Sequence, residues 1–346
     1  MACVSSCTDL YTAKLASRFF GADVGNWALI ASLLSWFNWF FSTRSYSNNF
    51  ECLCIFSLIV APVDYWFYGK PTFPIYQFLY INLHKNISQF YGSHPWHWYL
   101  SQGLAVVAFT HFPLAMYGWY TGAPFRERLK ENTKASRLFD SSLFNLCVWV
   151  VFAYSLIAHK EFRFLFPLVP IFCVYTGVAL YSMKKTKSNS KMRLLLTALL
   201  VLNTVPAYYL SRVHQVGVVD AVEWIRDIAA AKSEGVTGAL FLMPCHSTPF
   251  QAVLHNRELD ARFLTCEPPI NISSLEGYMD EADVFYADPA KFLDTYFRES
   301  GKEDVQVPGQ EYSIKTFRWA SHILIFEALE EDVRDRLLTR GYRLKG

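Results

Sequence analysis

A short charged turn, His159-Lys160-Glu161-Phe162-Arg163, is the part of the sequence best suited to bind an anion. Arg can hold a phosphate through two parallel hydrogen bonds, and Lys acts as a compact point charge. If the following helix continued backwards through the turn, Lys160 and Arg163 would lie three residues apart on neighbouring positions, with His159 one turn away from Arg163. Glu161 would then orient these cations or lie apart from them. The alternative is a turn at a membrane boundary whose Lys and Arg side chains extend to water.

A second unusual stretch, Tyr91-Gly-Ser-His-Pro-Trp-His-Trp-Tyr99, combines two histidines with large amphipathic rings. Trp and Tyr rings anchor at the headgroup level of a membrane, which accounts for the aromatic residues but not for His94 and His97. Two histidines are too few ligands for a metal site, so we expect no metal. His94, Trp96 and His97 are therefore candidates for contacts with a substrate, and the alternative is an aromatic belt.

Two further ionisable residues, Arg44 and Asp64, stand next to apolar segments. Charged groups at a membrane edge are costly unless they are solvated or paired. Taken alone, each is more often a structural flank than a site residue, and we carry both as weaker candidates.

Composition places the chain among membrane proteins. Hydrophobic residues make up 52% of its 346 residues and charged residues only 18%, against the ~25% usual in soluble globular chains. This composition excludes disorder, collagen and coiled coil, and the net charge of +2 does not fit a basic nucleic-acid-binding protein. We therefore expect no nucleic-acid partner.

Five apolar stretches in the first two thirds of the chain are each about long enough to cross a ~30 Å hydrocarbon core. They are Val24 to Ser42, Gly103 to Tyr120, Leu143 to His159, Phe164 to Met183 and Leu194 to Tyr209. Prolines inside them do not exclude helices, because neighbouring helices can satisfy the freed carbonyls. The sequence thus predicts a mostly α-helical, polytopic membrane bundle; the alternative is a soluble protein with buried helices.

Basic residues in two short loops predict the orientation, because such loops stay in the cytosol. One loop carries Arg126, Arg128, Lys130, Lys134 and Arg137, and the other carries Lys184, Lys185, Lys187, Lys191 and Arg193. The chain crosses twice between these loops, so the turn at His159 is expected on the luminal side, like the stretch before Gly103. Residues 1–212 would form the membrane domain, and residues 213–346 a luminal domain.

Other residues bear on the luminal assignment. Sequons for N-glycosylation occur at Asn86 and Asn271, both in segments assigned to the lumen. Cys245 and Cys266 lie in the same compartment, where a disulfide can persist, although two free thiols fit the sequence equally well.

The number of membrane crossings predicted from the apolar segments does not agree with the predicted orientation. Cys52 to Pro62 is an apolar run of only ~11 residues, too short to span a bilayer. Yet an even number of crossings is needed between Thr43 and the loop that carries His94. Either this run is re-entrant, or helices are missing from this chain relative to a complete protein.

The pattern changes after about Val213. Compact apolar runs at 239–243, 261–264 and 323–326 predict strands. Helices are expected after Asp220 as a cap, after Asp288-Pro289 with proline in the first turn, and over Glu331 to Arg340. Strands that alternate with helices favour a small α/β domain.

The charged turn at His159 and the stretch around His94 resemble segments of a known protein family. His159-Lys-Glu-Phe-Arg-Phe-Leu-Phe-Pro167 is similar to the signature of glycosyltransferase family 22, the mannosyltransferases that assemble glycosylphosphatidylinositol (GPI) anchors and dolichol-linked oligosaccharides. Phe90 to Gly103 and Phe241 to Pro249 are similar to the members that act on GPI precursors. Leu34-Ser-Trp-Phe-Asn38 and Thr43 to Asn48 resemble a further family segment.

The resemblance implies a GT-C fold in the endoplasmic-reticulum membrane. It further implies transfer of mannose from dolichol-phosphate mannose to the GPI precursor lipid, in α-1,2 linkage with inversion and without a cofactor. A carboxylate would deprotonate the acceptor hydroxyl, and cations would stabilise the departing dolichyl phosphate. On this reading His159, Lys160 and Arg163 bind the donor phosphate.

The chain departs from the family pattern in two places. Family members begin with a helix and a luminal loop whose acidic motif supplies the base, and no such segment precedes Val24. They also carry more helices between the segments around Glu51 and Tyr68. We expect a truncated and internally shortened form without catalytic activity, in which Asp64 is the best substitute for the base.

Three alternative functions remain. The first is an inactive isoform that binds lipid or partners. The second is a sister enzyme that acts on dolichol-linked oligosaccharides, against which the stretch around His94 speaks. The third is a transporter, for which Asp140 is the nearest ionisable candidate, although it stands at a helix start rather than mid-helix.

Overall fold

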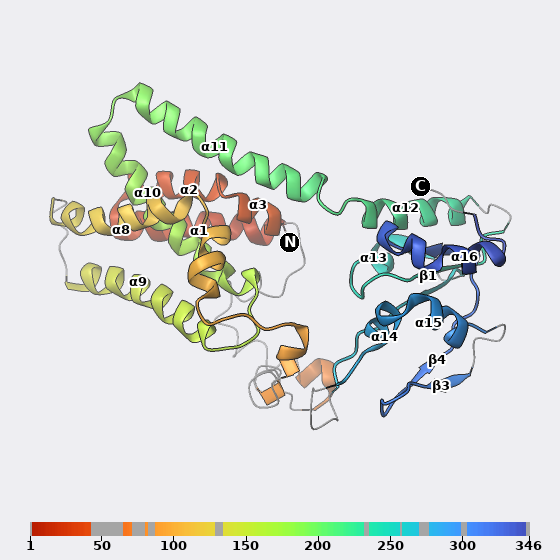
Figure 1. Cartoon of the computed structure of the whole chain (residues 1–346). Coiled ribbons are helices and arrows are strands. Elements are labelled where there is room, and N and C mark those ends of the chain that lie inside the picture. Colours follow the sequence, from red (N-terminus) through yellow and green to blue (C-terminus); the bar gives the residue numbers. More distant parts are fainter. Residues whose placement is uncertain are drawn as a thin grey trace. The chain divides into compact units, whose positions relative to one another are not determined.

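The computed structural model describes residues 2–42, 65–70, 80–81, 87–128, 134–231, 235–256, 258–269, 277–298 and 303–343. The chain divides into two compact units, Met1–His214 and Gln215–Gly346. Figure 1 shows helices throughout the first unit and all the strands in the second.

The first unit is built from helices. They are α1 (Ala2–Phe20), α2 (Ala22–Leu33), α3 (Trp36–Ser42), η2 (Ile87–Tyr91), η3 (Tyr99–Gly103), α7 (Leu104–Val107), α8 (His111–Arg128), α9 (Lys134–Ser155), η4 (Phe162–Leu168), α10 (Val169–Thr186) and α11 (Asn189–Arg212). Helix α10 is the centre, and it packs against α1, α2 and α8. Two glycines permit this: a Cβ on Gly177 would lie 2.6 Å from the Ala28 backbone, and one on Gly118 would lie 1.8 Å from the Tyr175 carbonyl. Small residues at helix crossings are typical of membrane bundles.

Two helical segments among the described residues are long and apolar enough to cross a membrane: Phe162–Thr186 and Asn189–Ala230. The other expected spans are interrupted or shorter. Helix α2 ends at Leu33 and α3 begins at Trp36. Between α7 and α8 the chain turns at Phe109, whose φ of 40° is a left-handed conformation that interrupts a right-handed α-helix. The apolar part of α9 covers only Ser142–Ser155.

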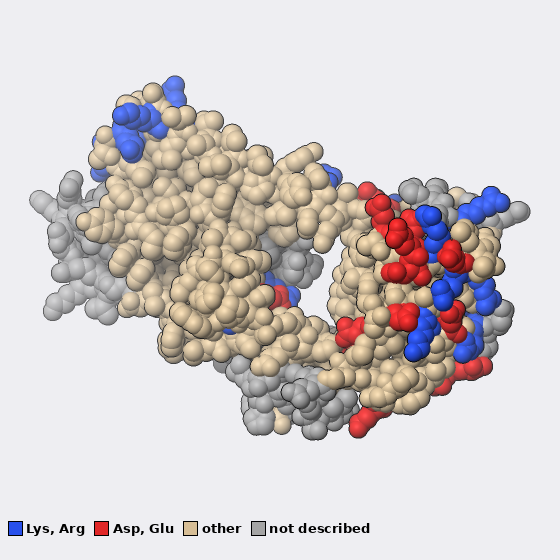
Figure 2. All heavy atoms as spheres, viewed as in Figure 1, with Lys and Arg blue, Asp and Glu red and all other residues tan. Residues whose placement is uncertain are grey.

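Charge is distributed unevenly over the two units. In the view of Figure 2, Lys and Arg atoms of the first unit gather at the turn between α10 and α11, where α10 ends with Lys184 and Lys185. Most of the remaining described surface of this unit carries no Lys, Arg, Asp or Glu in that view, whereas both signs intermingle on the second unit. A broad uncharged surface with cations at one end is the pattern expected of membrane helices.

The second unit has a small sheet with helices. Strands β1 (Gly238–Phe241), β2 (Asp260–Phe263) and β5 (His322–Leu324) form a parallel sheet of order β2-β1-β5, and β3 (Asp304–Gln306) pairs antiparallel with β4 (Ser313–Lys315). The helices are α12 (Gly217–Ala230), α13 (Phe250–Leu254), α14 (Glu281–Ala287), α15 (Pro289–Tyr296), η5 (Glu327–Leu329) and α16 (Glu330–Thr339). The three predicted strands are therefore confirmed.

The helix starts in this unit follow the sequence in one case and not in another. Asp288 caps α15 by accepting from the Lys291 backbone N–H at 2.9 Å, with Pro289 in the first turn as predicted. The expected cap at Asp220 is wrong, because α12 begins three residues earlier at Gly217 and Asp220 lies within its first turn. There its carboxylate still stands near the positive end of the helix dipole.

Candidate functional site

The two chemical stretches singled out in the sequence lie against each other. The backbone N–H of His94 donates to the Ala158 carbonyl at 2.9 Å, and the ring Nδ1 of His159 lies 3.0 Å from the Gly92 carbonyl. The backbone N–H of Glu161 donates to the Tyr99 hydroxyl at 3.2 Å. Residues more than sixty positions apart in the chain thus form one hydrogen-bonded site, which we call the paired loops (residues 92–99 and 157–163).

Lys160 is the innermost cation of the paired loops. Its side chain is 3% exposed, and its ammonium donates to the His94 carbonyl at 3.1 Å and to the Ile157 carbonyl. Partial desolvation lowers the pKa of Lys160. The ammonium therefore joins the backbones of both loops, and its position is that of an internal support.

Glu161 links the other two charged side chains of the turn. Its Oε1 lies 2.9 Å from His159 Nε2 and accepts a 2.6 Å hydrogen bond from Arg163 Nη2, while Oε2 pairs with Arg163 Nε. The side chain of Arg163 is 40% exposed and that of Glu161 29%. Arg163 is thus the cation of this turn that reaches solvent, held in orientation by a carboxylate.

The turn is not a backward extension of the helix, which corrects the expected spacing. Residues 156–161 are non-helical and η4 begins at Phe162, with Glu161 in an extended conformation at φ −135° and ψ 151°. This extended step is what allows the carboxylate of Glu161 to reach both His159 and Arg163.

Buried aromatic rings pack against the paired loops. Trp98 is 6% exposed and stacks on His94 at a ring-centroid distance of 4.8 Å, and it contacts Phe162 at 4.7 Å. Tyr99 is fully buried and donates to the Glu161 carbonyl at 3.3 Å. By contrast, Trp96 is 67% exposed, and its ring meets that of the exposed His97 edge-on at 5.7 Å.

Sequence reasoning assigned Tyr99 to an aromatic belt and missed its role as the hydrogen-bond partner of Glu161. No local signal marks this role, because the partner lies 62 residues away. Four other candidates, Arg44, Asp64, Asn86 and Asn271, lie outside the described residues.

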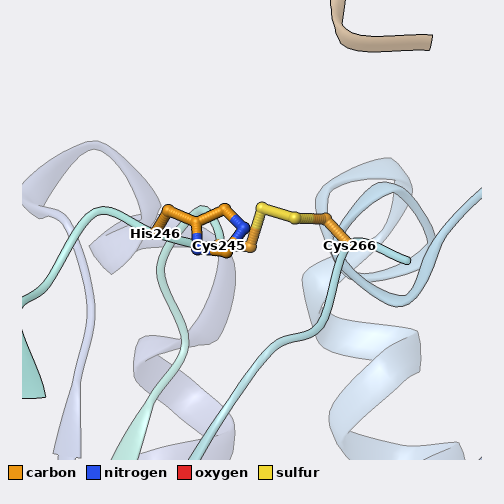
Figure 3. A group of neighbouring side chains, drawn as sticks. All are labelled: Cys245, His246 and Cys266. Carbon is orange, nitrogen blue, oxygen red and sulfur yellow. A yellow bond between two sulfur atoms is a disulfide. The ribbon is translucent and has the colours of Figure 1, made fainter. Parts of the chain in front are cut away.

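A second group of chemical interest lies in the C-terminal unit. Cys245, His246 and Cys266 bring three ligand-type atoms within 4.8 Å of one another, and the two cysteines form a disulfide (Figure 3). The bond joins the segments that follow β1 and β2 and resolves the choice that the sequence left open between a disulfide and free thiols. Sulfurs bonded to each other are not thiolates, so the intact bridge is structural.

The comparisons with known proteins agree with the motifs. The profile of the Alg9-like mannosyltransferase family matches residues 1–61 and 52–255. The chain is 33% identical to GPI mannosyltransferase 3 of Yarrowia lipolytica over 416 positions, covering 99% of this chain and 75% of the relative. It is 27% identical to GPI alpha-1,2-mannosyltransferase 3 of Homo sapiens over 409 positions, covering 99% of this chain and 67% of the relative.

A third relative, GPI mannosyltransferase 3 of Drosophila melanogaster, is 36% identical over 317 positions, covering 87% of this chain and 51% of the relative. No solved structure matches the chain. Because the family profile covers well over half of the residues and a relative above 30% identity matches nearly all of them, the chain belongs to the Alg9-like mannosyltransferases and resembles the GPI mannosyltransferases 3 among them.

Proposed function

We propose that the chain serves mannosyl transfer in GPI-anchor assembly, with dolichol-phosphate mannose as donor and the GPI precursor lipid as acceptor, forming an α-1,2 bond. The similarity to GPI mannosyltransferases 3 over nearly the whole chain supports the reaction class. The observation that carries the site is the solvent-reaching Arg163, held by Glu161 within the paired loops.

In this reaction the acceptor hydroxyl attacks C1 of the mannose and the C1–O bond to the phosphate breaks. Dolichyl phosphate leaves with the bonding electrons, and a carboxylate takes the hydroxyl proton. Arg163 would bind the departing phosphate by two parallel hydrogen bonds, with His159 beside it at the shared carboxylate. Lys160 would act from within, by holding the two loops in register, rather than by direct contact.

The rims of the paired loops would bind the sugars. Trp96 is the exposed ring best placed to stack on a mannose or acceptor ring, and His94 and His97 lie on the same loop. Arg44 and Asp64 remain candidates for substrate contact and for the base.

For the location, we propose a multi-pass protein of the endoplasmic-reticulum membrane, with residues 1–212 as a GT-C-like bundle and residues 213–346 in the lumen. The two long apolar segments and the cationic turn between α10 and α11 support membrane insertion with that turn in the cytosol. The disulfide between Cys245 and Cys266 fits an oxidising lumen.

Glycosylation and protease access test this topology. In intact microsomes, glycosidase-sensitive modification at Asn271 and protection of the C-terminal unit from external protease are expected. Digestion of that unit from the cytosolic side would refute the luminal assignment.

A second candidate function, an inactive form that keeps the scaffold, is favoured by one observation. The alignment to the Yarrowia lipolytica relative runs over 416 positions although this chain has 346 residues, so the relative carries internal residues without a counterpart here. These residues would include the helices expected between the segments around Glu51 and Tyr68, which would position the base, and a displacement of ~1 Å at a reacting group costs about 10²-fold in rate.

Complementation separates the two candidates. In cells without GPI mannosyltransferase 3, the inactive form fails to restore GPI-anchored proteins at the surface, while a chimera carrying the relative's acidic luminal loop and its additional internal segment restores them. Full rescue by this chain alone would establish it as an active enzyme and make Asp64 the first residue to mutate. Absence of rescue by a well-expressed chimera would refute the proposed reaction.

A further inference from the structure

The C-terminal unit contains a cavity of about 800 Å³ whose described lining carries three arginines and no carboxylate. The arginines are Arg318, Arg340 and Arg343, and the rings of Trp224, Trp319 and Tyr342 line it as well. Most charged surface on this unit mixes both signs (Figure 2). A pocket whose described lining has cations and no carboxylate is therefore a local exception, and it is complementary to an anion.

The rings and cations of this cavity are held in place by contacts within the unit. The guanidinium of Arg340 lies over the Trp319 ring at 4.9 Å, and Trp319 meets Tyr342 at 6.0 Å. Gly341, with φ 86°, reverses the chain directly after α16. The Tyr342 hydroxyl donates to the Ala320 carbonyl, which fastens this end of the chain to the segment before β5.

A second cavity of about 730 Å³ continues from the first along strand β5. Both are lined by Trp224, Ser321, His322, Tyr342 and Arg343, so the two cavities adjoin, and we call them together the groove. The far end is mainly apolar, with Val218, Ile323, Leu337 and Leu338 in its lining and Ile325 and Phe326 directly after β5, but Glu327 and Arg334 line it as well. The groove is thus cationic and aromatic at one end and mainly apolar at the other, where Glu327 and Arg334 add one charge of each sign.

We propose that this groove binds the headgroup of an anionic phospholipid. Its phosphate lies against Arg318 and Arg343, a polyol ring on the phosphate packs on Trp224, and the first part of its chains enters the apolar end. Arginine and ring faces are the groups that recognise phosphate and the C–H faces of polyols. A soluble phosphate would need only the cationic end, so the joined apolar end favours the lipid.

The position of the groove in the chain agrees with a lipid ligand. Its wall α12 begins at Gly217, only five residues after α11 ends at Arg212, and both helices belong to Asn189–Ala230, one of the two described segments able to cross a membrane. The wall of the groove is therefore continuous in sequence with an apolar segment of membrane-spanning length. Trp224 in that wall is still 37% exposed, as a ring available to a ligand must be.

Photocrosslinking with mapped sites tests the proposal on the full chain. The probes are phosphatidylinositol and phosphatidylcholine carrying the same photoactivatable acyl chain, in detergent micelles, with labelled peptides identified by mass spectrometry. Phosphatidylinositol is expected to label peptides from α12, β5 and α16. The double variant R318Q/R343Q should lower this labelling at least about tenfold, because two charge-assisted contacts are lost.

Matched variants control for charge and folding. Lys291→Ala with Lys315→Ala removes two exposed cations of the same unit outside the groove and should leave labelling unchanged. Arg318→Lys with Arg343→Lys keeps the charge and should retain most of it. A single symmetric peak in size-exclusion chromatography and an unchanged melting temperature show that each variant has folded.

Three results would overturn the proposal. Equal labelling by phosphatidylcholine, which has the same phosphodiester but a cationic choline, would mean that the groove does not select an anionic headgroup. Equal labelling of R318Q/R343Q and of the wild type would show that these two arginines do not bind the phosphate. Loss of labelling when inositol 1-phosphate is added at the concentration of the lipid would identify a soluble phosphate ester as the occupant. Since no mannosyl transfer is measured, the result is independent of the proposed reaction.

Discussion

Replacement of Lys160 by methionine tests whether this cation supports the paired loops from inside. Methionine keeps the length of the side chain and removes the ammonium that now donates to the carbonyls of His94 and Ile157. Each buried carbonyl left unpaired costs about 1–3 kcal/mol. Removal of a desolvated charge returns part of this, as the lowered pKa of Lys160 indicates. We expect a net loss of about 2 kcal/mol in the free energy of unfolding.

The assay is thermal unfolding of the detergent-solubilised full chain. Size-exclusion chromatography after heating measures the fraction that is still folded. For a unit of this size, about 2 kcal/mol corresponds to a melting temperature roughly 4–8 °C lower. The matched control is Arg163→Met, three residues away, whose side chain is 40% exposed and pairs with a carboxylate. An exposed ion pair contributes about 0–1 kcal/mol, so its melting temperature should fall by less than about 4 °C.

The comparison between these two variants decides the question. If Lys160→Met melts at the wild-type temperature, or loses less than Arg163→Met, the ammonium is not a structural support. Lys160 would then be available for the donor phosphate, as the sequence first suggested.

Three further predictions concern activity, the disulfide and pH. In an active version of the enzyme, Arg163→Ala should lower turnover about 30- to 1000-fold, corresponding to roughly 2–4 kcal/mol of barrier, with Arg163→Lys restoring only part; unchanged transfer rates in a microsomal assay would contradict this. Replacing Cys245 and Cys266 by serine should cost about 3 kcal/mol, since the bridge closes a loop of 21 residues, and a melting curve unaffected by the double replacement would contradict the bond. Burial raises the pKa of Glu281, so the stability it contributes is complete below its ordinary pKa of 4.5 and is lost as pH rises through the raised value. The pH dependence of melting in this range should therefore flatten in Glu281→Gln, and an identical pH profile in the variant would show that other groups cause it.

Part of this protein follows from local sequence. Apolar runs bounded by turn residues predicted the strands β1, β2 and β5, because strand formation depends on short patterns of apolar residues. Asp288 followed by Pro289 specified the start of α15, because a cap and a fixed φ act within one turn. The family was identified from motifs that are contiguous in the chain, and the profile and relatives confirm it.

The same local reasoning was less reliable for the apolar helices. Hydropathy averages over a window and does not register a break such as that between Leu33 and Trp36, or the left-handed Phe109. These interruptions depend on how neighbouring helices pack, which no window contains.

Only the tertiary structure decided how the site is built. The sequence supplied His159, Lys160 and Arg163 as one group of cations, but their roles differ because of contacts with a loop more than sixty residues away. Those contacts bury the ammonium of Lys160 and leave Arg163 in reach of solvent. The pairing of Cys245 with Cys266 and the joining of Arg318 and Arg343 in one groove likewise depend on distances in space, which the order of residues alone does not determine.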